Sequence, residues 1–463
     1  MLYLSTRGGE KDVSFSSAVI NGLANDGGLY VPESFPFFSE KDIKDLSHLD
    51  YPNLAYEVTK NFISSGDIPA DKYKEICIKT YDNQFSKKII DISKLNDNEY
   101  ILNLFHGPTL AFKDYALQLL GNIYEYILEK EKIRLTIIGA TSGDTGSAAI
   151  HGCSKSKKVN MFILFPHGKV SEIQRKQMTT FNSKNVYTIA VKGNFDDCQK
   201  LVKDFFKSNE RKRLKLAAIN SINWVRIMGQ IVYYFWSYFR VSRGNERINY
   251  VVPTGNFGNV YAGYVCKRMG LPIDKLIICS NKNDILTRFF ESGKMLTKEA
   301  IKTLSPSMDI QVSSNFERLL YNFYKKPLEI RNLFRNLEEK GVFEVDTNVL
   351  NSLKNYFKYG RLNDEDTLNA IKTIHNKFNL IIDPHTAVGY AVGKKILADN
   401  MKRIYLATAH YSKFIDSVKK VVKEKTNLPK SIEGILKKKE DFYLLNNELD
   451  DFIEFVKERS GTT

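Results

Sequence analysis

The stretch that decides the fold reads Phe105-His106-Gly107-Pro108-Thr109-Leu110-Ala111-Phe112-Lys113-Asp114. Residues 99–105 alternate between apolar and polar side chains, as a strand does, and Gly107 and Pro108 end that strand. After the stretch, apolar residues recur at helical spacing, at Ala116, Leu119, Leu120, Ile123 and Ile127. Lys113 is therefore predicted where a sheet ends and a helix begins, beside a mouth between strands.

Lys113 has the surroundings of a reactive amine. Phe112 flanks it, and removal from water lowers the pKa of a lysine. The neutral amine is a nucleophile that can form a Schiff base with an aldehyde cofactor. The competing interpretation is a solvated lysine in the first turn of a helix, which is the ordinary state of lysines in proteins.

The composition indicates a soluble globular protein. A chain of 463 residues suggests two or three domains, and no apolar run approaches 20 residues although 43% of the residues are hydrophobic. The first residues lack the apolar core of a signal peptide, so a cytoplasmic location is expected. Five cysteines lie far apart without a CxxC pair, which indicates buried thiols of a reducing compartment, and the seven histidines show no metal-ligand spacing.

A net charge of +15 raises the question of nucleic-acid binding. The lysines are dispersed, with only short clusters such as residues 437–439, and no RRM, zinc-finger or basic-zipper pattern accompanies them. A solvated surface is the better interpretation, and we expect neither a nucleic-acid partner nor a membrane. The positive field is suited to attracting an anionic substrate.

The order of predicted elements indicates an α/β fold with open, mostly parallel sheets. Residues 1–95 are predicted to form an N-terminal α+β domain, and strands alternate with helices over 96–284. A helical insertion is expected at 285–378, the core returns at 379–427 with a strand near 380–382, and a charged, helical, peripheral tail covers 428–463. Ligands of such a sheet bind beyond the carboxyl ends of its strands.

Ser142-Gly143-Asp144-Thr145-Gly146 follows a predicted strand and opens a helix. Two glycines free the backbone there, and the N–H groups and dipole of a helix N-terminus favour an anion such as a carboxylate. A simple helix cap by Ser142 or Asp144 explains the residues equally well.

A second glycine-containing loop, Pro253-Thr254-Gly255-Asn256-Phe257-Gly258-Asn259, also joins a strand to a helix. Successive N–H groups can converge there as a nest for a phosphate. Because the Walker lysine and the GxGxxG pattern are both absent, one small phosphate fits better than a nucleotide. The alternative is a plain tight turn.

Two further segments, residues 165–178 and 220–226, carry cations and amides suited to a phosphorylated side chain. The candidate ligands in them are Lys169, Ser171, Asn220, Ser221 and Arg226. His106, His385 and His410 are interpreted as hydrogen-bonded structural histidines.

The motifs, taken together, resemble those of threonine synthases of the longer, fungal and Gram-negative type, and the resemblance runs from the N-terminal module to about residue 414. It implies a pyridoxal-phosphate enzyme of fold type II with Lys113 as the Schiff-base lysine. Residues Gly255, Asn256, Phe257, Gly258 and Asn259 would grip the cofactor phosphate. Thr408, in the segment Leu406-Ala407-Thr408-Ala409-His410-Tyr411-Ser412-Lys413-Phe414, would hydrogen-bond the pyridine nitrogen.

By the same resemblance, residues 142–146 form the substrate-carboxylate loop, with Ser142 and Thr145 as ligands. Asp144 stands where relatives often place an asparagine beside the cofactor hydroxyl. The family usually continues Pro-Ala-Lys-Phe after the histidine, whereas this chain has Tyr411-Ser412-Lys413-Phe414, which puts the shape of that turn in question.

The implied reaction converts O-phospho-L-homoserine and water into L-threonine and phosphate, in a monomer or homodimer. The alternative enzyme is a threonine-synthase-like phospho-lyase that releases phosphate, ammonia and a ketoacid. From a different class, a basic RNA-binding or scaffolding protein on an inactive enzyme fold is disfavoured by the intact Lys113, Gly255–Asn259 and Thr408.

Overall fold

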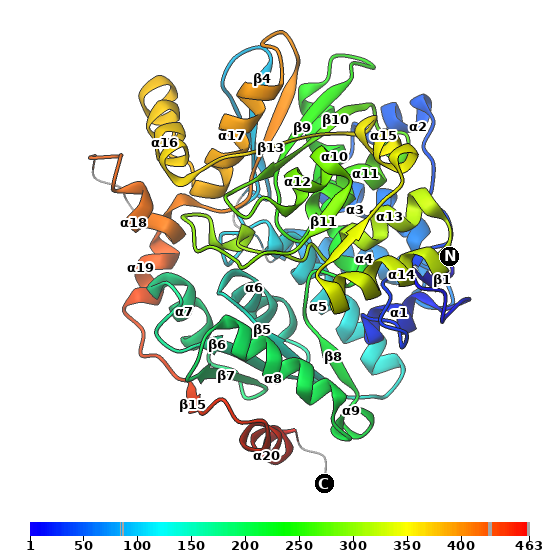
Figure 1. The fold of residues 1–463 in the computed structure, drawn as a ribbon. Helices are drawn as coiled ribbons and strands as arrows, with labels where there is room; N and C mark the ends of the chain where they lie inside the picture. The colour runs from blue at the N-terminus through cyan, green and yellow to red at the C-terminus, as the bar shows by residue number, and fades with distance from the viewer. Residues whose placement is uncertain (84, 86–87, 425–427, 461–463) are drawn as a thin grey trace.

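Two separate sheets form the framework of the protein (Figure 1). The computed structural model describes residues 1–83, 85, 88–424 and 428–460. The larger sheet has the order β13-β10-β9-β14-β4-β3 and the smaller one β15-β7-β6-β5-β8. Within the larger sheet only the β3–β4 pair is antiparallel, and every pair of the smaller sheet is parallel. The predicted α/β class with mostly parallel sheets is confirmed.

The strands are β1 (Tyr3–Ser5), β2 (Tyr30–Pro32), β3 (Asp91–Lys94), β4 (Glu99–Asn103), β5 (Leu135–Ala140), β6 (Val159–Pro166), β7 (Val186–Val191), β8 (Leu216–Ala218), β9 (Ile248–Pro253), β10 (Ile273–Ser280), β11 (Lys294–Leu296), β12 (Val342–Glu344), β13 (Phe357–Arg361), β14 (Arg403–Ala407) and β15 (Tyr443–Leu445). Pairs β1–β2 and β11–β12 form two small antiparallel sheets outside the main ones.

The α-helices are α1 (Phe15–Asn21), α2 (Glu40–Leu46), α3 (Tyr51–Thr59), α4 (Ala70–Asn83), α5 (Lys113–Lys130), α6 (Asp144–Cys153), α7 (Glu172–Thr179), α8 (Phe195–Lys207), α9 (Glu210–Arg213), α10 (Trp224–Val241), α11 (Gly258–Arg268), α12 (Ile285–Ser292), α13 (Phe316–Tyr324), α14 (Pro327–Lys340), α15 (Thr347–Lys354), α16 (Asp364–Phe378), α17 (Pro384–Ile396), α18 (Ile415–Val418), α19 (Lys430–Leu436) and α20 (Leu449–Arg459). Short 3₁₀ turns are η1 (Lys60–Phe62), η2 (Pro306–Met308) and η3 (Tyr411–Phe414). None of the described helices combines the length and apolar character that a membrane crossing requires.

The prediction of a strand near residues 380–382 is wrong. Those residues lead into α17, whose N-cap Asp383 accepts a hydrogen bond from the backbone N–H of His385, and Ile382 packs in the core without pairing. The missing strand is β13, inside the predicted helical insertion, where it pairs with β10 at the sheet edge. An edge strand is only partly buried, so Lys358 and Arg361 interrupt the apolar pattern that would have revealed it.

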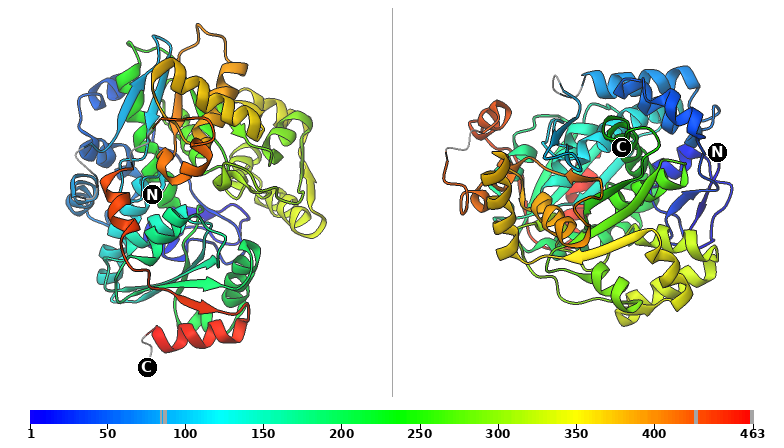
Figure 2. Two further views of the ribbon diagram at one scale, coloured as in Figure 1. Left: turned by 90° about the vertical axis from the view of Figure 1, so that its left-hand side faces the viewer. Right: turned by 90° about the horizontal axis from the view of Figure 1, so that it is seen from above.

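The C-terminal tail is more than a peripheral helical segment. Its strand β15 pairs with β7 and extends the smaller sheet, and α20 packs against α8. Figure 2 shows this red segment lying along the smaller sheet, far from the N-terminal strand β1. The proposed domain boundaries otherwise remain predictions, although β3, before residue 95, belongs to the larger sheet.

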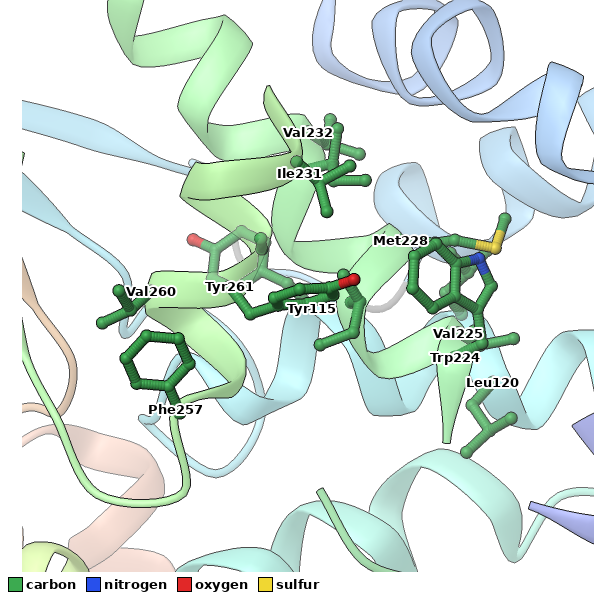
Figure 3. Close-up of a cluster of buried hydrophobic side chains, with 14 of the residues drawn as sticks. Tyr115, Leu120, Trp224, Val225, Met228, Ile231, Val232, Phe257, Val260 and Tyr261 are labelled. Atoms are coloured by element: carbon green, nitrogen blue, oxygen red, sulfur yellow. The ribbon is translucent and has the colours of Figure 1, made fainter. Parts of the chain in front are cut away.

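Helix α10 is the centre of the main hydrophobic core (Figure 3). Its first residue, Trp224, contacts the rings of Tyr3 and Phe62 from the N-terminal region and of Tyr261 from α11. These contacts attach the N-terminal module to the catalytic framework. Because α10 is buried nearly all round, its sequence carries apolar residues on every face, and its polar residues are Arg226, Gln230, Ser237 and Arg240.

Helices α5 and α6 cross unusually closely, and each is the first helix after a strand, α5 after β4 and α6 after β5. A Cβ atom on Gly121 of α5 would lie 1.9 Å from the carbonyl oxygen of Gly152 in α6, and one on Gly152 would lie 2.3 Å from the carbonyl oxygen of Leu117. Only glycine at both positions permits this approach. The crossing fixes where the first residues of the two helices, Lys113 and Asp144, lie relative to each other.

We expect Gly121→Ala to lower the free energy of unfolding by about 1–3 kcal/mol, the usual cost of overpacking. Urea denaturation followed by circular dichroism measures it. The control is Gly434→Ala in α19, where an added Cβ meets no atom within 4 Å and alanine favours the helix. Equal midpoints for the two variants would contradict the role of the glycine contact.

Candidate active site

A cavity lies beyond the carboxyl ends of the central strands of the larger sheet. The loop after β4 brings Lys113 to it, the loop after β9 brings residues 254–257, and Thr408 follows β14 directly. Thr145 reaches the cavity from α6, beyond β5 of the smaller sheet. The cavity, called the central cavity below, is lined by Phe112, Lys113, Thr145, Ser221, Arg226, Gln230, Pro253, Thr254, Gly255, Asn256, Phe257, Gly258, Asn259, Val260, Ser307, Met308, His385 and Thr408.

Lys113 is the first residue of α5, and its side chain is 11% exposed. Its Nζ lies 3.1 Å from Asp144 Oδ2 and 5.4 Å from the centre of the Phe112 ring. Burial lowers the pKa of Lys113, although the Asp144 carboxylate opposes the shift. The predicted position and desolvated state of this lysine are both present in the structure.

Asp144 is a buried carboxylate at the first residue of α6. Oδ2 accepts hydrogen bonds from Lys113 and from Ser307 Oγ at 3.2 Å, and Oδ1 accepts from Gln174 Nε2 at 2.8 Å. The Lys413 ammonium lies 2.7 Å from Oδ1. Burial would raise the pKa of Asp144, but the two lysines hold it well below its usual value. Asp144 is therefore ionised.

The loop at residues 255–259 has the geometry of an anion nest. Phe257 has a φ of 62°, in the left-handed region, and Gly258 begins α11, so consecutive N–H groups turn toward the helix axis. Carbonyl groups are turned outward, because Gly255 O accepts from Ser313 Oγ at 2.7 Å and Asn256 O accepts from Asn315 N at 3.1 Å.

Asn259 completes this nest. Its Oδ1 accepts hydrogen bonds from the hydroxyls of Tyr233 and Tyr234, at 2.6 and 3.0 Å. These bonds fix the orientation of the amide, whose Nδ2 is buried without a hydrogen-bond partner in the structure. A buried, unpaired donor is costly unless a ligand accepts from it. The nest thus presents a fixed amide to an anion.

Arg226 lines the central cavity and carries a second unpaired donor. It lies in the first turn of α10, 3% exposed, and its Nη1 donates to the carbonyl oxygen of Asn220 at 3.0 Å. Its Nε is buried without a partner, and burial lowers the pKa of this guanidinium to about 10. A desolvated cation of this kind favours an anionic ligand.

Thr408 lines the central cavity at the end of β14. Its backbone oxygen accepts a hydrogen bond from the N–H of Phe112 at 2.9 Å, which ties the lysine loop to this strand. The hydrogen bond therefore holds the segments that carry Thr408 and Lys113 next to each other, and both residues line the central cavity. The role of the Thr408 hydroxyl toward a pyridine nitrogen stays a prediction.

Some predicted ligands lie outside the lining of the central cavity. Ser142 and Lys169 are exposed, and Ser171 caps α7, donating its hydroxyl to Gln174 Oε1 at 2.8 Å. Asn220 accepts from the N–H of Ile222 at 3.1 Å through Oδ1. The structure brings Thr145, Ser221 and Arg226 to the central cavity, which the four residues above do not line. The substrate roles of all seven residues remain predictions.

Ser307, Gln174 and Lys413 contact Asp144 at the site and are not marked as site residues by any motif in the sequence. Ser307 belongs to η2, in a segment without periodicity, and no local signal marks it. His385 was interpreted as a structural histidine and is hydrogen-bonded, donating from Nδ1 to Asp383 Oδ1 at 2.8 Å and accepting from the N–H of Ser307 at 3.2 Å. It also lines the central cavity.

Comparisons with known proteins identify the family. The family model described as "Threonine synthase N terminus" matches residues 2–81, "Pyridoxal-phosphate dependent enzyme" matches 89–329, and "Threonine synthase, C-terminal" matches 386–456. Threonine synthase of Pseudomonas aeruginosa is 41% identical, covering 100% of this chain and 99% of its own. That of Saccharomyces cerevisiae is 40% identical, covering 98% and 99%. The chain belongs to the threonine synthase family.

Solved structures of this family have the same fold. The crystal structure of PLP-bound threonine synthase from Brucella melitensis is 41% identical, with a TM-score of 0.95 over 99% of both chains. The threonine synthase structure from yeast has a TM-score of 0.93 and 37% identity over 100% of this chain and 99% of that one. The resemblance deduced from the motifs is confirmed.

As a member of this family, the chain is a pyridoxal-phosphate-dependent enzyme. The residues present fit the cofactor, because an amine with a lowered pKa and an anion nest with an unpaired Asn259 donor share one cavity. Lys113 would hold the aldehyde and residues 255–259 the phosphate. Among the described residues, no group of histidine, cysteine and acidic side chains is arranged to hold a metal ion.

We expect Gly255→Ala to weaken pyridoxal-phosphate binding by about tenfold, because the new Cβ would lie 2.7 Å from the carbonyl oxygen of Ser307 and displace one wall of the nest. Equilibrium dialysis against pyridoxal phosphate measures the affinity. The remote Gly434→Ala serves as the control. Unchanged affinity in the Gly255 variant would separate this loop from the cofactor phosphate.

Proposed function

We propose that this chain converts O-phospho-L-homoserine and water into L-threonine and phosphate. The observation that carries the proposal is the placement of Lys113, a desolvated amine, in one cavity with the 255–259 nest and the unpaired Arg226. A phosphorylated amino-acid substrate and a phosphorylated cofactor both require anion sites, and the cavity offers more than one.

Pyridoxal phosphate, when bound, supplies an electron-withdrawing system that stabilises negative charge at the substrate's α- and β-carbons. Lys113 acts as the general base that takes the proton from the α-carbon and moves protons at the β-carbon. Phosphate leaves from the γ-carbon, which then takes up a proton to become a methyl group, and water adds its hydroxyl at the β-carbon while a proton returns to the α-carbon. The lowered pKa of Lys113 keeps its amine available as a base.

The remaining residues orient the substrate. Thr145 and the N-terminus of α6 favour the substrate carboxylate, since backbone N–H groups and the helix dipole attract an anion there. Arg226 and Ser221 bind the substrate phosphate. Closure over the bound substrate of the part of the protein built on the smaller sheet would exclude competing water from the reaction.

A cytoplasmic location and a monomeric or homodimeric state accompany this function. The location is supported by the five cysteines, Cys77, Cys153, Cys198, Cys266 and Cys279, which are all free and buried. Free thiols are typical of a reducing compartment. A nucleic-acid partner has no role in the reaction.

Lys113→Ala removes the base and the attachment point of the cofactor, so turnover of O-phospho-L-homoserine should fall by at least about 1,000-fold. Released phosphate and L-threonine are both quantified. Lys372→Ala, at an exposed position of α16, is the matched control and should retain full activity. An active Lys113 variant would refute the mechanism.

The same assay separates the synthase from the phospho-lyase alternative. A synthase yields one L-threonine for each phosphate released, whereas the lyase yields phosphate with ammonia and a ketoacid. Formation of the ketoacid as the main product would overturn the proposed reaction while leaving the role of Lys113 intact.

Arg226→Gln should raise the KM for O-phospho-L-homoserine by about tenfold or more, because it removes a charged hydrogen bond to the substrate phosphate. Steady-state kinetics at saturating pyridoxal phosphate measures this change. Arg240→Gln, at the exposed end of the same helix, is the control. A loss of cofactor affinity with an unchanged KM would instead assign Arg226 to the cofactor.

A further inference from the structure

Lys413 is a buried cation behind the central cavity, to which none of the steps above assigns a role. It lies in η3, just after β14, with its side chain fully buried. Its Nζ lies 2.7 Å from Asp144 Oδ1 and donates to the carbonyl oxygen of Thr109 at 2.8 Å. Lys413 therefore contacts both the loop that precedes Lys113 and the carboxylate that Lys113 binds.

The two lysines occupy different oxygens of the same carboxylate. Lys113 binds Oδ2 and Lys413 binds Oδ1, so a single buried negative charge faces two amines. If both amines were protonated, the buried cluster would carry one excess positive charge. If only Lys413 is protonated, the cluster is neutral, which a desolvated environment favours.

The geometry points to Lys413 as a positioning residue for Lys113: it neutralises Asp144 and holds that carboxylate in place, so that the Lys113 amine can lose its proton and remain hydrogen-bonded. This inference rests on the proposed role of Lys113. Without Lys413, Asp144 would pair with Lys113 alone and stabilise its ammonium form.

Thr109 shows how rigidly Lys413 is placed. Its carbonyl oxygen also accepts from Gln177 Nε2 at 3.1 Å, and its N–H and hydroxyl donate to Asp114 at 2.9 and 2.8 Å. These hydrogen bonds fix the position of Thr109, whose carbonyl oxygen accepts from Lys413.

Other charged or titratable groups around the cluster do not supply the same neutralisation. Arg226 of α10 lowers the pKa of Lys113 as Lys413 does, but its Nη1 is bound to Asn220 O. Burial raises the pKa of Asp114 to about 6, and burial lowers the pKa of His410 to about 4. His385 of α17 is bound to Asp383 and Ser307. His151 of α6 has a pKa lowered by burial to about 4.

The test measures Lys113 directly. Full-length protein freed of pyridoxal phosphate is labelled with acetic anhydride, which reacts only with neutral amines, and the rate at Lys113 is read by peptide mass spectrometry from about pH 6 to 11. In Lys413→Met we expect the pH midpoint of labelling to rise by about one unit, so that labelling below the midpoint slows about tenfold. Lys413→Arg keeps the charge and should restore the midpoint.

Asp144→Asn should shift the pH midpoint of Lys113 labelling in the opposite direction. It removes the carboxylate that favours the ammonium form, so the Lys113 midpoint should fall. Adding Lys413→Met to Asp144→Asn should raise the midpoint again, because a like charge is lost. If Lys413→Met alone fails to fold, comparing Asp144→Asn with the double variant still tests the inference, because neither variant leaves a buried unpaired carboxylate. Lys372, exposed on α16, is the internal reference for labelling.

An unchanged Lys113 midpoint on replacing Lys413 by Met, in either background, would overturn the inference and leave Lys413 with a packing role only. The measurement needs no substrate, so it stands even if the product assay shows a different reaction. In the loaded enzyme the acid limb of the kcat profile should shift upward with the labelling midpoint, with KM little changed. A shift in KM alone would contradict the positioning role.

Discussion

The hydrogen bond between Lys113 and Asp144 is the contact on which the site depends. Each residue opens a helix that follows a strand, α5 after β4 of the larger sheet and α6 after β5 of the smaller one. The pair therefore joins the two sheets at the point where their carboxyl ends face each other. The glycine contact between Gly121 and Gly152 allows the helices to cross closely enough for the pair to form.

Buried ion pairs contribute little to stability, since the loss of hydration offsets the attraction between the charges. The cluster around Asp144 is therefore better explained by chemistry than by folding. Its carboxylate is held by Gln174 and Ser307 as well as by the lysines, so every oxygen is occupied before a ligand arrives. Burial then acts on Lys113, whose pKa is lowered despite the neighbouring negative charge.

Local patterns in the sequence were sufficient to find two of the loops that line the central cavity, because strand–loop–helix junctions place their residues without long-range help. Lys113 and residues 255–259 were predicted in this way, whereas Thr408, which alone would be an ordinary strand residue, was predicted only from the resemblance to threonine synthases. All of them line the central cavity. Gln174, Ser307 and Lys413 were missed because each reaches Asp144 from a different part of the chain. Strand β13 was missed for a related reason: its partner β10 lies far before it in the sequence, and its edge position weakens the apolar pattern.

Unpaired donors locate the anion sites more sharply than the glycine motifs do. A glycine loop alone is compatible with an ordinary turn, but a buried donor without a partner costs about 1–3 kcal/mol. Asn259 Nδ2 and Arg226 Nε both carry this cost, and both residues line the same cavity. Tyr233 and Tyr234 hold the Asn259 amide in that orientation, so the cost is maintained by the surrounding core. Anionic ligands that accept from both donors would offset it, which ties the packing of α10 and α11 to the recognition of phosphate.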